Sequence, residues 1–299
     1  MASSKGFLVL LIFLILSITL LFGCTDTSNY TWDNDTFQYV KNDSANNSDS
    51  KDSNFQSTPQ ISIDSNFDSN ALLIASWNLQ IFGPSKASSP TLLNYYAEKI
   101  SEYDIIVIQE IRDSAQEAFP KLCALLPEYD CIVSSRAGRS SSKEQYGIIF
   151  KGVELVSTKD YSPVEQVFFE RPPFEATFKK NGWVFTLITI HTKPDDVNNE
   201  LTLVEEKLKP REDEEIILLG DLNADCDYYD ANAETQFDSS FVWAIPDDVD
   251  TTVSKTNCAY DRIIFSNSVQ DNFLGYGIMS DVNLEHSDHY LVFGAFSTN

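Results

Sequence analysis

Short apolar runs recur along residues 71–299, and polar residues follow or precede them at regular points. The clearest run is 216–219, four apolar residues that read as a strand buried on both faces. Gly220 breaks this run, and Asp221 and Asn223 follow it. Comparable strand-like runs occupy 71–77, 104–108, 129–134, 147–150, 174–178, 183–190, 263–265 and 290–296. Apolar residues at helical spacing predict helices within 88–103, 115–126 and 197–208.

The order of these elements predicts the fold class. Strands alternate with helices early in the domain, whereas strand pairs dominate its middle and end. This order predicts an α/β (α+β) domain in which two mixed sheets pack face to face, with helices outside.

Polar residues that can bind a metal ion or transfer protons lie at the boundaries of the predicted strands. Those that follow strand ends are Asn78, Glu110, His191, Asp221 and Asn223. Those that precede strand starts are Asp261, Asp288 and His289. In a mixed sheet the ends of some strands lie beside the starts of others, so all eight side chains can converge on one rim.

The residue types at this rim suit one kind of chemistry. Carboxylates and amides are ligands for Mg²⁺ or another hard cation. Two histidines provide acid–base catalysis near neutral pH, and Glu144 and Asp261 are available to orient the imidazoles. A zinc site is disfavoured, because the sequence contains no His/Cys spacing typical of zinc.

The first seventy residues differ from the rest in composition. Residues 6–23 are almost wholly apolar and lead to Cys24, which fits a lipoprotein signal, although an uncleaved membrane anchor stays open. Residues 25–70 are rich in Ser, Asn, Asp and Thr, a composition that cannot bury enough apolar surface to order itself. We therefore expect a signal or anchor at 1–24, a disordered tether at 25–70 and one domain at 71–299. Both N-terminal alternatives place the domain on the extracellular side of the membrane or in the medium.

The cysteine count is consistent with an oxidising compartment. If Cys24 carries lipid, four cysteines remain, and an even number outside the cell suggests two disulfides. Buried free thiols are the alternative.

The net charge is unfavourable for binding a polyanion. The chain has 21 basic and 45 acidic residues, a net charge of −24. Phosphate binding therefore needs metal ions or a local basic patch. Arg136, Arg139 and Lys143 form one candidate patch, although a solvated loop explains them equally well.

The domain resembles the deoxyribonuclease I branch of the endonuclease/exonuclease/phosphatase superfamily. The matching pieces, in family order, are ASWNLQIFG, VIQEIRD, SKEQYGIIF, ERPPFEATF, LITIHTKP, LLGDLNADCDYY, TNCAYDRIIFS and HSDHYLV. GDLNADCDYY and TNCAYDRI are the most specific of these. The resemblance implies a four-layer α/β/β/α sandwich.

The resemblance also implies a role for each matched residue. Glu110 binds a catalytic Mg²⁺ or Mn²⁺, and around the metal and the scissile phosphate lie Asn78, Asp221, Asn223 and Asp288. His191 with Glu144, and His289 with Asp261, form the acid–base machinery. Arg112 and Arg171 contact the DNA backbone. Cys226 and Cys258 form a structural disulfide. A structural Ca²⁺ loop contains Asp250, Thr252 and Thr256.

Three departures from the family pattern accompany these matches. Ser142 stands where the family has a tyrosine that stacks on a minor-groove sugar, which puts minor-groove insertion in doubt. The small cysteine-closed loop before ERPPF is absent, together with its Ca²⁺ site. Cys123 and Cys131 have no counterpart and either form a new bridge or stay free.

Together these features predict a secreted or surface-tethered, divalent-metal-dependent endonuclease that cuts DNA and acts as a monomer. The alternatives are a sphingomyelinase or phosphoinositide phosphatase of the same superfamily, or an inactive binding module on the same scaffold. Retention of both histidines and of every matched carboxylate argues against the inactive module.

Overall fold

The computed structural model describes residues 30–33, 38–41, 60–61, 71–139, 142–229, 237 and 240–298. The chain divides into two compact units, 1–55 and 56–299. In the first unit, β1 (Tyr30–Asp33) and β2 (Gln38–Lys41) pair antiparallel within the range that we predicted to be a tether. The predicted signal or anchor at 1–24, including Cys24, lies outside the described residues. Among the residues that are described, no helix is long and apolar enough to cross a membrane.

The second unit contains two six-stranded sheets. The first sheet has the order β13 (Phe273–Met279), β14 (Leu291–Ser297), β3 (Ala71–Phe82), β4 (Ile105–Ile111), β6 (Gln145–Phe150), β5 (Asp130–Val133). The second has the order β11 (Phe241–Trp243), β12 (Asp261–Ser266), β10 (Ile216–Asp221), β9 (Trp183–Thr189), β8 (Phe174–Lys180), β7 (Glu154–Asp160). Each sheet is mixed, because β3 pairs parallel with β4, and β9 with β10, whereas the other pairs are antiparallel.

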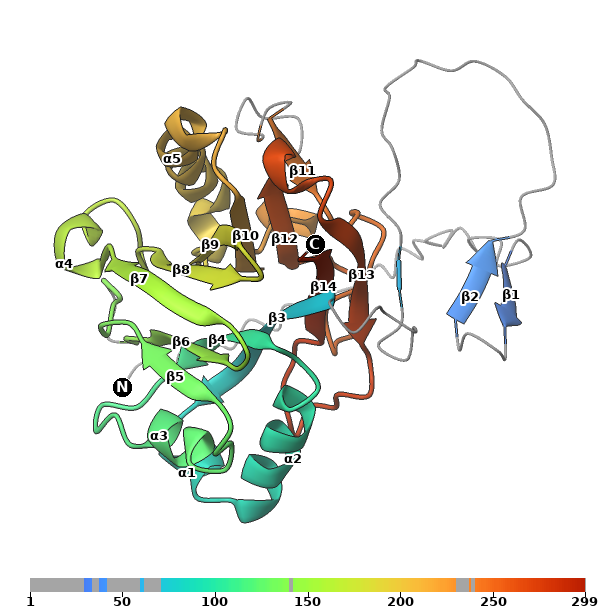
Figure 1. The fold of residues 1–299 in the computed structure, drawn as a ribbon. Helices are drawn as coiled ribbons and strands as arrows, with labels where there is room; N and C mark the ends of the chain where they lie inside the picture. Colours follow the sequence, from blue (N-terminus) through green and yellow to red (C-terminus); the bar gives the residue numbers. More distant parts are fainter. Residues whose placement is uncertain are drawn as a thin grey trace, which may run out of the picture. The chain divides into compact units, whose positions relative to one another are not determined.

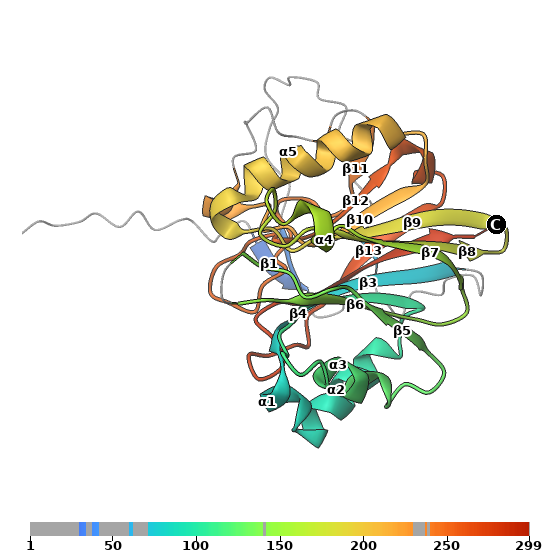
Figure 2. The ribbon, with the colours of Figure 1, turned by 90° about the vertical axis from the view of Figure 1, so that its left-hand side faces the viewer.

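Helices cover the outer faces of the two sheets (Figure 2). On the first sheet lie α1 (Pro84–Ala87), α2 (Pro90–Ile100) and α3 (Ala118–Cys123). On the second lies α5 (Val197–Leu208), and the short α4 (Ser162–Glu165) follows β7 (Figure 1). The predicted four-layer α/β/β/α sandwich is therefore confirmed.

Apolar side chains fill each of the three interfaces between these layers. Between the sheets pack residues such as Phe178, Leu219 and Phe296. Outside the first sheet, Trp77 and Tyr96 belong to the cluster that includes α2, and outside the second, Leu201 of α5 packs near Leu218. Because β10 contributes alternate side chains to two clusters, its four apolar residues are all buried, as the run 216–219 predicted.

Several elements differ from the sequence prediction. The strands β7, β11 and β13 were not predicted. β7 is largely exposed and polar, and β13 contains two glycines, so neither shows a clear apolar alternation. β3 extends to Phe82, and α3 is shorter than the predicted helix at 115–126.

Two further features are links between segments. Cys123 and Cys131, which the sequence left open, form a disulfide between α3 and β5. Gln60 forms a parallel bridge with Tyr276 on the edge strand β13, and the Ile61 N–H donates to the Tyr276 carbonyl at 2.6 Å.

The sheet topology explains why the polar residues gather. β3 and β4 end at the same edge of their sheet, as do β9 and β10, because the strands of each pair are parallel. The antiparallel strands β6, β12 and β14 begin at this edge. The residues at the ends of β9 and β10 and at the starts of β12 and β14 therefore meet at one rim.

Candidate active site

His191 is held by the carboxylate of Glu144. Its Nδ1 lies 2.9 Å from Glu144 Oε2, and its backbone N–H donates to the Tyr146 hydroxyl at 2.9 Å. Glu144 Oε1 accepts from Arg112 at 2.7 Å and from Arg171 at 3.1 Å. Burial would raise the pKa of Glu144, but the charges of His191, Arg171 and Arg112 reverse this and lower it to about 2. Glu144 is therefore a carboxylate that fixes the imidazole by its Nδ1 side.

His289 is held in the same way by Asp261. Its Nδ1 lies 2.8 Å from Asp261 Oδ2, and Asp261 is fully buried at the start of β12. The His289 N–H donates to the Ser287 hydroxyl at 3.1 Å, and the Trp77 indole N–H donates to the His289 carbonyl at 3.0 Å. The His289 backbone is thus held at both its N–H and its carbonyl.

The two imidazoles converge on one carboxylate. Asp221 Oδ2 lies 3.3 Å from His191 Nε2 and 3.5 Å from His289 Nε2. Burial would lower the pKa of His289, but Asp261, Asp221 and Asp288 outweigh this and raise it to about 10. Burial would likewise raise the pKa of Asp221, but the two imidazoles lower it. The Nε2 atoms of two acid–base groups therefore face one point.

Glu110 joins this group through Asn78. The Asn78 amide donates to Glu110 Oε1 at 3.2 Å and to Asp221 Oδ2 at 3.0 Å. Glu110 Oε2 accepts from the Ile81 N–H at 2.7 Å and lies 3.2 Å from Arg112 Nη2. Asp288 Oδ1 lies 3.8 Å from His289 Nε2, and it is buried without a hydrogen-bond partner among the described residues.

Unusual backbone conformations cluster at this rim. Gln80, Ile81, Glu110 and Asn223 have φ of 41°, 54°, 58° and 46°, in the left-handed region that non-glycine residues rarely adopt. Gly220 has a φ of 153°, and a Cβ there would collide with the Ile190 carbonyl, so this position requires glycine. Strain of this kind persists where the surrounding structure enforces it, commonly at functional sites.

The loop containing Asp250, Thr252 and Thr256 lies against the same rim. The Val253 N–H donates to the Asp288 carbonyl at 2.8 Å, and Thr252 forms a bridge with His289. Thr252 Oγ1 lies 3.0 Å from Asp250 Oδ1, 2.9 Å from the Thr256 carbonyl oxygen and 3.3 Å from Ser254 Oγ. The loop thus brings a carboxylate, a carbonyl and hydroxyl oxygens close together, and these are the ligand types that Ca²⁺ takes.

The predicted pair Cys226 and Cys258 forms a disulfide. It joins the loop after Asp221 to the segment before Asp261. Asp225 Oδ2 also accepts the Ala259 N–H at 2.7 Å, and the Leu222 N–H donates to the Tyr260 carbonyl at 2.9 Å. The two segments are therefore fastened at several points.

Some residues that support the site were not predicted from the sequence. Arg262 is almost fully buried and donates to the carbonyls of Ala224 and Ile245 and to Asp247, each at 2.7 Å. Tyr146 accepts from His191 and donates to the Arg171 carbonyl at 3.2 Å. The signal available was position alone, because Trp77, Tyr146, Arg262 and Ser287 each lie within two residues of a predicted site residue.

The predicted DNA-contacting arginines divide into two groups. Arg112 and Arg171 belong to the site, because both donate to Glu144. Arg171 also donates to the carbonyls of His191 and Thr192. The second group has other partners: Arg139 pairs with Glu170 at 3.5 Å, and Arg136 donates to the Lys143 carbonyl at 3.2 Å.

Asn223 directs its amide to the Thr192 carbonyl at 3.2 Å.

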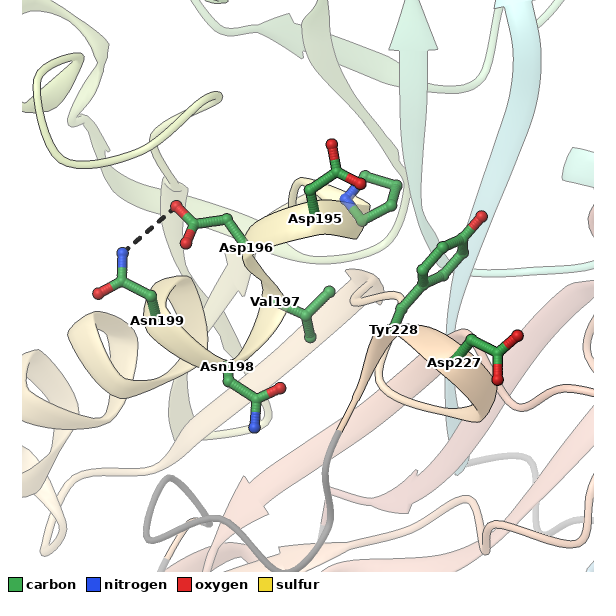
Figure 3. A pocket seen from close by; sticks show the side chains of 8 residues that line it. Asp195, Asp196, Val197, Asn198, Asn199, Asp227 and Tyr228 are labelled. Atoms are coloured by element: carbon green, nitrogen blue, oxygen red, sulfur yellow. Dashed lines mark hydrogen bonds between the residues drawn. The ribbon is translucent and has the colours of Figure 1, made fainter.

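A pocket of about 460 Å³ lies next to the segment that follows His191 (Figure 3). Its lining includes Asp195, Asp196, Asp227 and Tyr228. Figure 3 shows Asp195 and Asp196 on one side of the pocket and Asp227 and Tyr228 on the other. The carboxylates make this pocket a poor place for a phosphate group.

Comparison with known proteins identifies the family of the chain. Residues 75–289 match the model of the Endonuclease/Exonuclease/phosphatase family. The chain belongs to this family. It is 32% identical to Deoxyribonuclease-1 of Bos taurus over 256 residues, covering 74% of the chain and 91% of the relative. It is 35% identical to Deoxyribonuclease gamma of Homo sapiens over 259 residues, covering 74% and 85%.

Solved structures show the same family fold at lower identity. A humanized TDP2 of D. rerio has a TM-score of 0.60 and 18% identity, over 77% of this chain and all of that one. The mannosyl-6-phosphatase Bt3783 of Bacteroides thetaiotaomicron has a TM-score of 0.59 and 21% identity, over 75% and 99%. As a deoxyribonuclease I-like member of the Endonuclease/Exonuclease/phosphatase family, the chain is a phosphate-ester hydrolase.

Proposed function

We propose that this protein is an endonuclease that hydrolyses DNA phosphodiester bonds with the help of a divalent metal ion. The observation that carries the proposal is the convergence of two carboxylate-held imidazoles on Asp221 Oδ2, at 3.3 and 3.5 Å. Relatives named as deoxyribonucleases, at 32% and 35% identity, support DNA as the substrate.

Glu110 and Asp288 would hold the catalytic metal, with Asp221, Asn78 and Asn223 beside the metal and the phosphate. The donor set is all oxygen and amide, which suits Mg²⁺ or Mn²⁺, and the buried Asp288 Oδ1 that lacks a hydrogen-bond partner supports a cation there. A bound divalent ion supplies positive charge to the phosphate oxygens. In the loop of Asp250, Thr252 and Thr256, a Ca²⁺ ion would have a structural role.

The protein's own groups account for the proton transfers. One imidazole takes a proton from the attacking water through Nε2, and the other gives a proton to the departing 3′-oxygen. Glu144 and Asp261 keep each ring oriented through Nδ1. Arg112 offers cationic N–H groups to the substrate backbone. Arg171 is buried and donates to Glu144 and two carbonyls, so it adds positive charge behind Arg112. Arg136 and Arg139 are further candidates for contact with the backbone.

The N-terminal pattern and the two disulfides support a location outside the cytoplasmic membrane, secreted or held by the N-terminal segment. We propose that the enzyme acts there as a monomer.

Nicking of supercoiled plasmid tests the proposed function. The wild type should nick in Mg²⁺ and Ca²⁺ and stop when a chelator removes the ions. His191→Ala and Glu110→Ala should abolish nicking, because they remove an acid–base group and a metal ligand. His286→Ala is the matched control, since its ring stacks on Tyr95 outside the site. Undiminished nicking by both site variants would refute the assignment. Cleavage of sphingomyelin or inositol phosphates instead of plasmid would point to the alternative substrates.

A further inference from the structure

Ile81 has a conformation that its residue type does not favour. It lies in an irregular part of β3. Asn78 pairs with Gln109 of β4 and the next pair is Phe82 with Ile111, so β3 has more residues than β4 between these two pairs. Its φ is 54°, and 56% of the residue is exposed. A β-branched residue in the left-handed region is strained, and an exposed side chain gains little from packing in return.

At this position the backbone, rather than the side chain, supports the structure. The Ile81 N–H donates to Glu110 Oε2 at 2.7 Å, a bond that any residue except proline can make. Asparagine or glycine would adopt the same φ with less strain. Neither the fold nor the support of Glu110 therefore explains an apolar, β-branched side chain here.

We propose that Ile81 is a substrate-contact residue whose side chain packs against the sugar next to the scissile phosphodiester. This inference rests on the proposed function. Because a Cβ lies about 2.5 Å from its own backbone nitrogen, the Ile81 side chain begins within about 5 Å of Glu110 Oε2. Arg112 Nη2 lies 3.2 Å from the same oxygen. A nucleotide whose phosphate reaches this carboxylate and arginine places its sugar beside Ile81.

The negative charge of the chain explains why an apolar contact with the substrate would be useful. With a net charge of −24, the protein has few cations to offer a polyanion, and Arg112 is partly engaged by Glu110 and Glu144. Contact between a side chain and the apolar face of a sugar does not depend on charge and is not screened by salt. Ile81 thus adds affinity for the substrate at a cost in stability.

The substitution Ile81→Asn separates stability from binding. Asparagine keeps the N–H bond to Glu110 and relieves the strain, so the melting temperature should rise by about 2 to 4 °C. The KM for plasmid or oligonucleotide DNA should rise roughly 3- to 10-fold. Ile81→Leu, which restores an apolar side chain, should have a KM closer to that of the wild type.

Salt dependence identifies the kind of contact that is lost. A plot of log(kcat/KM) against log[salt] should keep its slope in Ile81→Asn, whereas Arg112→Gln should make it shallower. Val184→Asn is the matched control, because Val184 is 45% exposed near the opposite end of β9 from His191. It should leave KM unchanged.

The outcomes distinguish the two proposals. A wild type that cleaves no DNA refutes the proposed function, and the role of Ile81 with it. If the wild type cleaves DNA and Ile81→Asn keeps the wild-type KM, or melts at a lower temperature, the role of Ile81 alone is overturned.

Discussion

Each of the two imidazoles at the candidate site has one ring nitrogen occupied by a carboxylate and the other directed at Asp221. Glu144 does more than hold His191, because it also accepts from Arg112 and Arg171. A single buried carboxylate therefore positions the imidazole and the two cations nearest to it. Loss of its charge removes one carboxylate contact from each of the three.

We predict that Glu144→Gln lowers kcat for DNA cleavage by roughly 10² to 10⁴-fold, as expected when an imidazole loses its orienting carboxylate. Steady-state nicking assays measure this change. Glu165→Gln is the control, since Glu165 is also partly buried but pairs with Lys207 rather than with a residue of the site. A kcat within twofold of the wild type would show that Glu144 does not position His191.

At the scale of elements, Asp113 decides where α3 begins. Its carboxylate accepts the N–H groups of Ala115, Glu117 and Ala118 at 2.9, 2.8 and 2.9 Å. These bonds hold residues 113–117 in a loop, so the helix starts at Ala118 rather than near Ala115. A side chain that binds the first N–H groups of a helix is a capping interaction.

Asp113→Ala should therefore lower the free energy of unfolding by about 1 to 2 kcal/mol. Burial would raise the pKa of Asp113, but the backbone N–H groups outweigh this and lower it below its ordinary value of 3.8. Because the folded state favours the ionised form, this stabilisation is present above about pH 4 and is lost as the pH falls further.

Urea unfolding between pH 7 and pH 3 checks this prediction. The difference between wild type and Asp113→Ala should shrink toward the acid end. Asp130→Ala, at an exposed position of β5, is the control. A difference that is constant with pH would mean that the charge of Asp113 contributes nothing.

At the scale of the whole molecule, the two disulfides have different relations to the site. Cys226–Cys258 closes 32 residues and joins the loop after Asp221 to the segment before Asp261. Cys123–Cys131 closes 8 residues between α3 and β5. Only the first connects segments that carry residues of the candidate site.

Replacing both cysteines of a pair by serine should therefore have different effects. Loss of Cys226–Cys258 should cost roughly 3 to 4 kcal/mol and lower kcat/KM, whereas loss of Cys123–Cys131 should cost roughly 2 to 3 kcal/mol and leave kcat/KM unchanged. Denaturant unfolding and plasmid nicking measure the two effects. Equal losses of activity in both variants would contradict a specific link between Cys226–Cys258 and the site.

The sequence by itself determined which central strands are buried. Runs such as 216–219 are apolar because both faces of a central strand are covered, and this pattern is local enough to read directly. The polar residues after these runs predicted the membership of the rim, and the family motifs predicted the four-layer fold and the pairing of Cys226 with Cys258. The edge strand β7 was not predicted, because it is largely exposed and its sequence has little apolar pattern.

Only the tertiary structure decided how the side chains at the rim meet. Glu144 and His191 are 47 residues apart, and their 2.9 Å contact depends on how β6 and β9 of different sheets pack. The shared position of both imidazoles at Asp221, the pairing of Cys123 with Cys131 and the left-handed backbone at Glu110 and Ile81 are of the same kind. These features arise from contacts between distant segments, and no local pattern of residues encodes them.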